Sequence, residues 1–292
     1  MFPNVPHWYL GMHERIYSFH MADFYFLCGI LVCHSYRRIS SISEYFAYVK
    51  KRLLKFGIPF LFFGTLLCAI NVLIKGGDLS GFVSGMRLLF VDTILSPATY
   101  LWFIIVLFQF YLVSPFLCQF SRYALPLAFL VAIILVIHPL PRFLTLHQFS
   151  RYLLFFLLGI LMRNILPYVN AKKTVWICLP FCLIFALTLW KIEWHPLFPA
   201  LASIPALAFI SFCLSHLQLF ARLAEFLSRR CFAIYLWQVL FIQALALPMK
   251  SLFPSTWGFI LFLVSVVPFA IFASLLADGG VKYTKQRMCK CA

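Results

Sequence analysis

Charged residues, and acidic residues above all, are scarce in this chain, and their scarcity excludes most classes of soluble protein. Charged residues make up 11% of the 292 positions, only 8 residues are acidic, and 64% are hydrophobic. A soluble domain usually has about 25% charged residues, so too few polar side chains are present here to cover a surface in water. With a mean hydropathy of +0.96, the sequence predicts an all-α, polytopic membrane protein. Nucleic-acid binding is not expected, because the basic residues are scattered between apolar runs.

Several motifs that would indicate a particular chemistry are also missing. The chain has no Gly-rich phosphate loop, no Gly-x-Ser-x-Gly nucleophile elbow and no zinc motif. His138, His147 and His195 lack metal-ligand spacing, so we expect no metal site and no tightly bound cofactor. The 10 cysteines lack the paired spacing of a secreted disulfide framework. No secretory signal peptide is visible at the start of the sequence.

Long apolar runs are what the chain has instead. A membrane-spanning helix needs roughly 20 mostly apolar residues. The segment 79–95 is moderately apolar but carries Arg87 and Asp92, so we interpret it as an interfacial or re-entrant piece. We expect one membrane-embedded domain over residues 1–292, ending in a short basic cytoplasmic tail at 278–292. The nine predicted spans are at about 20–36, 53–74, 99–118, 124–138, 149–162, 175–190, 197–216, 231–248 and 257–277.

The net charge of +16 is explained by the distribution of lysine and arginine around these spans. Basic residues are enriched in cytoplasmic loops of membrane proteins. Loops after the odd-numbered spans, together with the C-terminal tail, hold 17 of the 24 basic residues. The count therefore predicts a multi-pass protein of the cell membrane (inner or plasma membrane) with its C-terminus in the cytoplasm and its N-terminus outside.

The first predicted span begins with a histidine and a carboxylate three residues apart, His20 and Asp23. Positions three apart share one face of a helix, and ionisable groups inside a span raise the hypothesis of a functional site. A histidine oriented by a carboxylate can act as the general base that deprotonates a hydroxyl. The alternative is structural, with the two side chains satisfying each other or capping the span.

A second candidate site is the basic cluster formed by Lys51, Arg52 and Lys55, at the cytoplasmic end of the second span. One interpretation is an anchor beside anionic lipid headgroups. The other is a clamp for the phosphates of a donor such as a coenzyme A thioester.

Trp102, Tyr235 and Gln238 are candidates for contact with a substrate. The two aromatic residues stand near the starts of predicted spans, where aromatic anchors are also common. Gln238 lies inside a span and needs a hydrogen-bond partner, which a neighbouring helix could supply as well as a substrate could.

Five segments along the chain form a recognisable series: Phe19-His20-Met21 with Phe24-Tyr25-Phe26-Leu27-Cys28-Gly29, then Lys51-Arg52 with Ile58-Pro59, Leu101-Trp102-Phe103, Phe155-Phe156-Leu157-Leu158-Gly159, and Ala233-Ile234-Tyr235-Leu236. In order and spacing they resemble the motifs of the acyltransferase 3 family of integral membrane acyltransferases, notably its sugar O-acetyltransferases.

The resemblance implies ten spans, an acyl-CoA donor (acetyl-CoA above all) used from the cytoplasm as a co-substrate, and a hydroxyl of a cell-surface glycan or lipid-linked sugar as acceptor. The chain departs from the family pattern at Ala22, Asp23, Cys28 and Gln238. The family usually has one more helix, carrying a histidine, before the first predicted span, so we expect a member that lacks this helix. A transporter of glycan or lipid-linked sugar, and an inactive truncated member, are the alternatives to an active enzyme.

Overall fold

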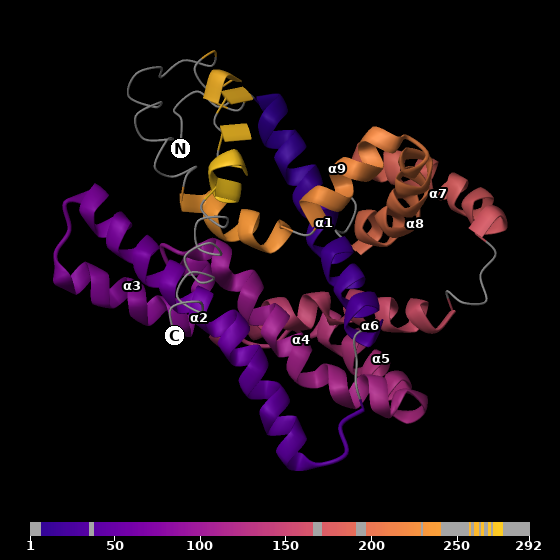
Figure 1. Ribbon diagram of the computed structural model, residues 1–292, viewed down its shortest axis with the longest axis horizontal. Coiled ribbons are helices and arrows are strands. Elements are labelled where there is room, and N and C mark those ends of the chain that lie inside the picture. The colour runs from indigo at the N-terminus through magenta and orange to yellow at the C-terminus, as the bar shows by residue number, and fades with distance from the viewer. Residues whose placement is uncertain are drawn as a thin grey trace, which may run out of the picture. The chain divides into compact units, whose positions relative to one another are not determined.

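Helices make up most of the described part of the computed structural model, and it contains no strand there (Figure 1). It describes residues 7–34, 38–165, 171–190, 197–228, 230–240 and, between 257 and 276, residues 257, 260–262, 264–265, 268–269 and 271–276. The prediction of an all-α fold is confirmed. The predicted tail at 278–292 lies outside the described residues.

Between His7 and Ser228, the described residues form nine α-helices and three short 3₁₀ helices. They are α1 (His7–His34), α2 (Ile42–Lys75), α3 (Leu79–Val91), η1 (Thr93–Leu95), η2 (Thr99–Leu101), α4 (Trp102–Gln119), α5 (Ser121–Ile137), η3 (Phe143–Thr145), α6 (Leu146–Ile165), α7 (Ala171–Trp190), α8 (Leu197–Ser215) and α9 (Gln218–Ser228). A further helical segment covers Cys231–Leu240.

Five of the described helices are long and apolar enough to cross a membrane, and they correspond to five of the nine predicted spans. The fourth, sixth and eighth predicted spans coincide with shorter apolar helices. Large apolar side chains such as Leu27 and Leu31 on α1 and Leu183 on α7 are more than half exposed, as lipid-facing side chains are. The chain is therefore a multi-pass membrane protein. The five long helices are Trp8–Cys33, Ile42–Lys75, Thr99–Gln119, Phe143–Arg163 and Leu197–Ser215.

The chain divides into two compact units, one made of Ile16–Phe209 and the other of Met1–Arg15 with Ile210–Ala292. Each is described by itself. The larger unit contains most of α1 and all of α2 to α7, and the smaller one contains α9 and the helix Cys231–Leu240.

Within the larger unit, α1 and α6 cross at two glycines, Gly29 and Gly159. A Cβ atom at Gly29 would meet the carbonyl oxygen of Phe156, and one at Gly159 would meet the carbonyl oxygen of Phe26. A Cβ atom at either position would also lie 3.1 Å from the Cα atom of the other glycine. Small residues let membrane helices approach this closely, because lipid supplies no hydrophobic force to bring them together.

An aromatic core is packed around this crossing. Tyr25 on α1 is fully buried, and its ring lies 5.1 Å from those of Phe110 on α4 and Tyr152 on α6. Phe110 in turn stacks on Phe156 with ring centroids 4.4 Å apart. These contacts fix α1, α4 and α6 against one another.

Contacts at successive levels along α1, from Ser18 to Cys33, give the directions of these helices. Tyr25 meets Phe103 near the start of α4, and Cys33 meets Cys118 at its end, so α1 and α4 run in the same direction. The cavity shared by Ser18 and His147 and the later crossing at the glycines show that α6 runs parallel to α1 as well. This is the arrangement that alternating spans require for the first, third and fifth.

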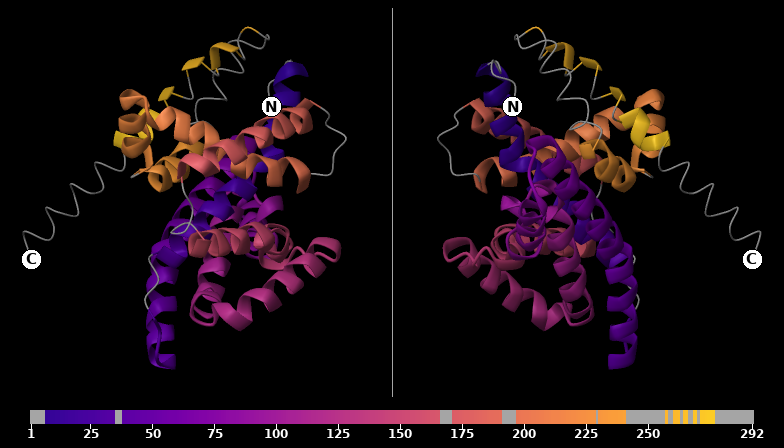
Figure 2. Two further views of the ribbon diagram at one scale, coloured as in Figure 1. Left: turned by 90° about the vertical axis from the view of Figure 1, so that its right-hand side faces the viewer. Right: turned by 90° about the vertical axis from the view of Figure 1, so that its left-hand side faces the viewer.

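Helix α2 is antiparallel to both α3 and α4. It has 34 residues, about 51 Å at 1.5 Å per residue, and continues through Pro59 as one helix (Figure 2). That exceeds the roughly 30 Å hydrocarbon core of a bilayer. Gly64 of α2 packs against Leu89 of α3, and Tyr48 nearer the start of α2 contacts α4. The segment 79–95 therefore contains a helix packed on α2; whether it is interfacial or re-entrant stays a prediction.

Candidate functional site

His20 lies on α1, is half-buried, and uses one ring nitrogen to bond its own helix. Nδ1 is 2.8 Å from the carbonyl oxygen of Ile16. A carbonyl can only accept, so Nδ1 carries the proton and donates it, and Nε2 is left as the basic nitrogen of the neutral ring. The ring of Tyr17 packs edge-on against the imidazole at 4.7 Å between centroids.

The structure does not pair His20 with Asp23, although the two share a helix face. Asp23 instead accepts a hydrogen bond of 2.8 Å from the hydroxyl of Ser203 on α8, which is 180 positions away in sequence. Its second oxygen, Oδ2, is buried and has no hydrogen-bond partner within the described part of the chain. Asp23 therefore links α1 to α8 through a hydrogen bond. Its role beside His20 stays a prediction.

The basic cluster of Lys51, Arg52 and Lys55 lies on α2. Lys51 and Lys55 are exposed and one turn apart. Arg52 is half-buried, and its guanidinium carbon lies 4.3 Å from the ring centroid of Tyr111 on α4 and 5.1 Å from that of Tyr48. Its Nε is buried without a hydrogen-bond partner among the described residues. Two aromatic faces thus hold a cation in place while leaving this donor unused.

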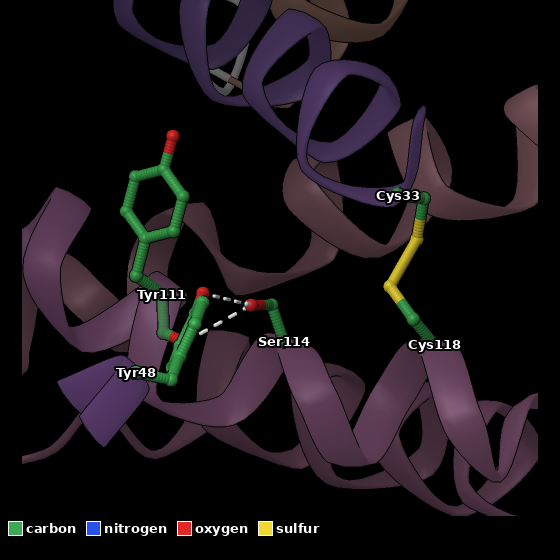
Figure 3. The surroundings of a disulfide bond; sticks show 5 residues. All are labelled: Cys33, Tyr48, Tyr111, Ser114 and Cys118. Atoms are coloured by element: carbon green, nitrogen blue, oxygen red, sulfur yellow. Dashed lines mark hydrogen bonds between the residues drawn. A yellow bond between two sulfur atoms is a disulfide. The ribbon is translucent and has the colours of Figure 1, made fainter. Parts of the chain in front are cut away.

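The backbone hydrogen-bond pattern of α4 is interrupted at Pro115, and this explains the position of Tyr48. Pro115 has no N–H, so the carbonyl oxygen of Tyr111 loses its partner within the helix. The Tyr48 hydroxyl donates to this oxygen at 3.2 Å, and the Ser114 hydroxyl does so at 2.9 Å. The oxygens of the two hydroxyl groups lie 3.3 Å apart (Figure 3). Since each hydroxyl has one proton, a bond between them forms only in place of one of the two bonds to Tyr111. Pro115 of α4 therefore helps to fix the side chain of Tyr48, whose ring contacts the guanidinium of Arg52.

A disulfide between Cys33 and Cys118 lies beside this arrangement (Figure 3). It joins the end of α1 to the end of α4, with 6.0 Å between the Cα atoms and 85 positions between them in sequence. Cys118 is one helical turn after Ser114, so the covalent link and the Tyr48 hydrogen bonds hold the same end of α4. Analysis of the sequence did not predict this pair, because cysteine spacing alone carries no connectivity.

Trp102, at the start of α4, stacks on Tyr152 with ring centroids 5.9 Å apart. Tyr152 in turn lines a cavity in the larger unit. Tyr235 and Gln238 belong to the smaller unit, where both line another cavity, of about 420 Å³, with Ser228 and Cys231. The structure thus brings Tyr235 and Gln238 together at one hollow and gives Trp102 an aromatic partner.

Metal ligands are not grouped anywhere in the described residues, where no three His, Cys, Asp or Glu side chains could hold one ion. Among the residues that sequence reasoning missed, Tyr48 had a usable signal, because it precedes Arg52 by four positions on the same helix. Ser203 and Tyr111 had none, because they meet Asp23 and Arg52 only through the fold.

No curated protein and no solved structure shows significant similarity to the chain. The family model described as an acyltransferase domain matches residues 2–278. The match includes all five segments that resemble the family's motifs, among them both glycines of the α1–α6 crossing. The chain therefore belongs to the acyltransferase 3 family of membrane acyltransferases.

Proposed function

We propose that this protein is an O-acyltransferase that moves an acyl group, in the first place acetyl, from acyl-CoA to a hydroxyl of a cell-surface glycan or lipid-linked sugar. The observation that carries the proposal is the family match over nearly the whole chain. The positions of the candidate residues support separate assignments for donor binding, for the general base and for contact with the acceptor.

The donor is assigned to the basic cluster on α2. Coenzyme A carries phosphates, and the cluster offers two exposed ammonium groups beside a guanidinium that is held by Tyr48 and Tyr111. The buried Nε of Arg52 lacks a partner among the described residues, and a phosphate oxygen would supply one. Aromatic support reduces the rotamer freedom that Arg52 would lose on binding.

His20 is assigned as the general base. Its Nε2 takes the proton of the acceptor hydroxyl while the hydroxyl oxygen attacks the thioester carbonyl. The carbon–oxygen bond forms, the carbon–sulfur bond breaks, and the proton on His20 passes to the departing thiolate of coenzyme A. The bond from Nδ1 to Ile16 fixes the tautomer that this role requires. Acceptor contact in the larger unit is assigned to Trp102. In the smaller unit, Tyr235 and Gln238 remain candidates for contact with a substrate.

We further propose that the C-terminus and the basic cluster face the cytoplasm of a cell membrane, where acyl-CoA is available. The support is the excess of lysine and arginine on that side of the predicted spans.

Transfer of label from acetyl-CoA to membrane glycans tests the proposal. His20→Ala should lower the rate by at least about 100-fold, since general base catalysis contributes about that much. His13→Ala is the matched control, because it removes an exposed histidine from the same helix. An unchanged rate in His20→Ala would remove His20 from the mechanism.

The donor part of the same assay uses Arg52→Gln with Lys75→Gln, at the other end of α2, as its control. Arg52→Gln should raise the KM for acetyl-CoA about tenfold or more, the cost of one charge-assisted hydrogen bond to phosphate. Equal effects of the two substitutions would contradict the donor site. Sugar export by a folded protein that transfers no acyl group would favour a transporter instead.

A further inference from the structure

A cavity of about 210 Å³ in the larger unit lies among α1, α5, α6 and α8, apart from the basic cluster on α2. Most of its wall is apolar, with Leu135 from α5 and Phe155 from α6 as examples. Polar groups enter it from Ser18 of α1 and from His147, Arg151 and Tyr152 of α6. Sites that bind small molecules often combine apolar walls with a few polar groups in this way.

The cavity carries positive charge from Arg151, and no described carboxylate lines it. His147 and Arg151 are one turn apart near the start of α6, where the helix dipole also favours an anion. The acidic side chains in the described part of the unit accept hydrogen bonds from other groups: Asp23 from Ser203, Glu44 from Ser40, Asp78 from Ser80, and Asp92 from the backbone N–H of Ile94. Asp23 follows the lining residue Ala22, and its Oδ2 has no partner among the described residues. Arg151 is exposed, and its guanidinium carbon lies 5.8 Å from the ring centroid of Tyr152.

A hydrogen bond from α4 reaches η3, the short helix just before α6, which has an unusual backbone conformation. Leu144 and Thr145 have φ angles of 49° and 60°, a region that residues other than glycine rarely adopt. The Gln109 side chain of α4 donates to the carbonyl oxygen of Leu144 at 2.8 Å. Ser150 donates to the main-chain carbonyl oxygen of His147 at 2.7 Å, within the first turns of α6. Strain of this kind is typical of binding and catalytic sites.

We propose that this cavity binds one oxyanion, a carboxylate or phosphate group, between Arg151 and His147. The cavity is too small for the nucleotide of coenzyme A, since drug-sized ligands need about 300–1,000 Å³. In the orientation proposed above, α6 begins on the outer side, where the acceptor arrives. The acceptor is therefore an acidic sugar or a sugar linked to a phosphate, a conclusion that rests on the proposed function. An anionic phospholipid headgroup offers the same chemistry.

Thermal unfolding of the purified full-length protein with glucuronate or inorganic phosphate tests the site. Both anions should raise the Tm, whereas methyl glucoside, which is neutral, should not. Arg151→Gln should weaken the apparent affinity at least about tenfold, because it removes a charge-assisted contact. Arg151→Lys should retain most of the response. Arg142→Gln, which changes an exposed arginine just before η3, should respond like the parent.

An equal response of Arg151→Gln and Arg142→Gln, or of glucuronate and methyl glucoside, would overturn the proposal. If Arg151→Gln does not fold, His147→Gln replaces it, with the same expected direction. Nanodiscs of phosphatidylglycerol and of phosphatidylcholine separate the two sources of the anion. Loss of glucuronate binding only in phosphatidylglycerol assigns the site to a lipid headgroup, and equal binding in both assigns it to the acceptor. Neither assay contains acyl-CoA, so absence of acyl transfer would contradict the proposed function and leave this site standing.

Discussion

At the scale of single residues, a shared helix face does not ensure that two side chains bond each other. His20 and Asp23 are three positions apart, yet His20 bonds the carbonyl oxygen of Ile16 and Asp23 accepts from Ser203. The Ile16 carbonyl lies one turn earlier on α1, and the Ser203 hydroxyl lies on α8. A histidine beside a carboxylate in the sequence is therefore a hypothesis about a pair, and the neighbouring helices decide whether the pair forms.

The Asp23–Ser203 hydrogen bond should be measurable as an interaction energy. We expect a double-mutant cycle of Asp23→Ala and Ser203→Ala to give a coupling of about 1.5–3 kcal/mol in thermal or denaturant unfolding, since a hydrogen bond to a charged group contributes about that much. The matched cycle of Asp23→Ala with His20→Ala should give a coupling near zero. Similar coupling in both cycles would mean that Asp23 supports His20 after all.

At the scale of helices, two glycines far apart in sequence perform one structural task. Gly29 and Gly159 belong to two of the segments that resemble family motifs, and the crossing of α1 and α6 requires both. The atoms that an added Cβ would meet belong to backbone, which cannot move without separating the helices. These motif glycines are thus explained by packing, and no catalytic role is needed to account for them.

Gly29→Ala and Gly159→Ala should each destabilise the protein by about 1–3 kcal/mol or prevent folding, the usual cost of overpacking. Gly57→Ala is the control, because a Cβ there meets only the Leu53 side chain, at 3.4 Å. Alanine also favours a helix over glycine, by up to about 1 kcal/mol, so this control should be neutral or stabilising. Equal Tm changes at the three positions would show that α1 and α6 do not meet at the glycines.

At the scale of the whole molecule, the disulfide and the charge distribution predict different compartments for the same helix ends. Cys33 and Cys118 end α1 and α4, at the side that the excess of lysine and arginine predicts to be cytoplasmic. The cytosol keeps thiols reduced, whereas oxidising compartments preserve disulfides. If the proposed orientation holds, we expect the cysteines that form this disulfide in the structure to be a dithiol in growing cells and to form the bond when exposed to an oxidant.

A variant that retains only Cys33 and Cys118 tests this orientation. Blocking free thiols in intact cells with membrane-permeant N-ethylmaleimide, followed by reduction and a mass tag, should leave the pair untagged. Oxidation of membranes before blocking should yield two tags per chain, because the Cα atoms are already 6.0 Å apart. Two tags without added oxidant would place these helix ends in an oxidising compartment and reverse the proposed orientation.

The fold class and most helix positions could be predicted because they depend on local properties. Long apolar runs have no stable alternative to a helix in lipid, since every backbone polar group must be satisfied within the segment. Arg87 and Asp92 set the segment 79–95 apart from the predicted spans, and that distinction stays a prediction. The candidate site was only partly predictable, because Arg52 indicates a cation but not the rings that hold it.

The sequence by itself determined that this is an all-α membrane protein, which side of it is more basic, and which family motifs it carries. Only the tertiary structure decided that Asp23 bonds Ser203, that the Tyr111 ring contacts Arg52, and that Cys33 meets Cys118. The reason is physical. Burial in lipid acts on each segment separately and can be read along the chain, whereas these contacts join residues up to 180 positions apart and exist only once helices have packed.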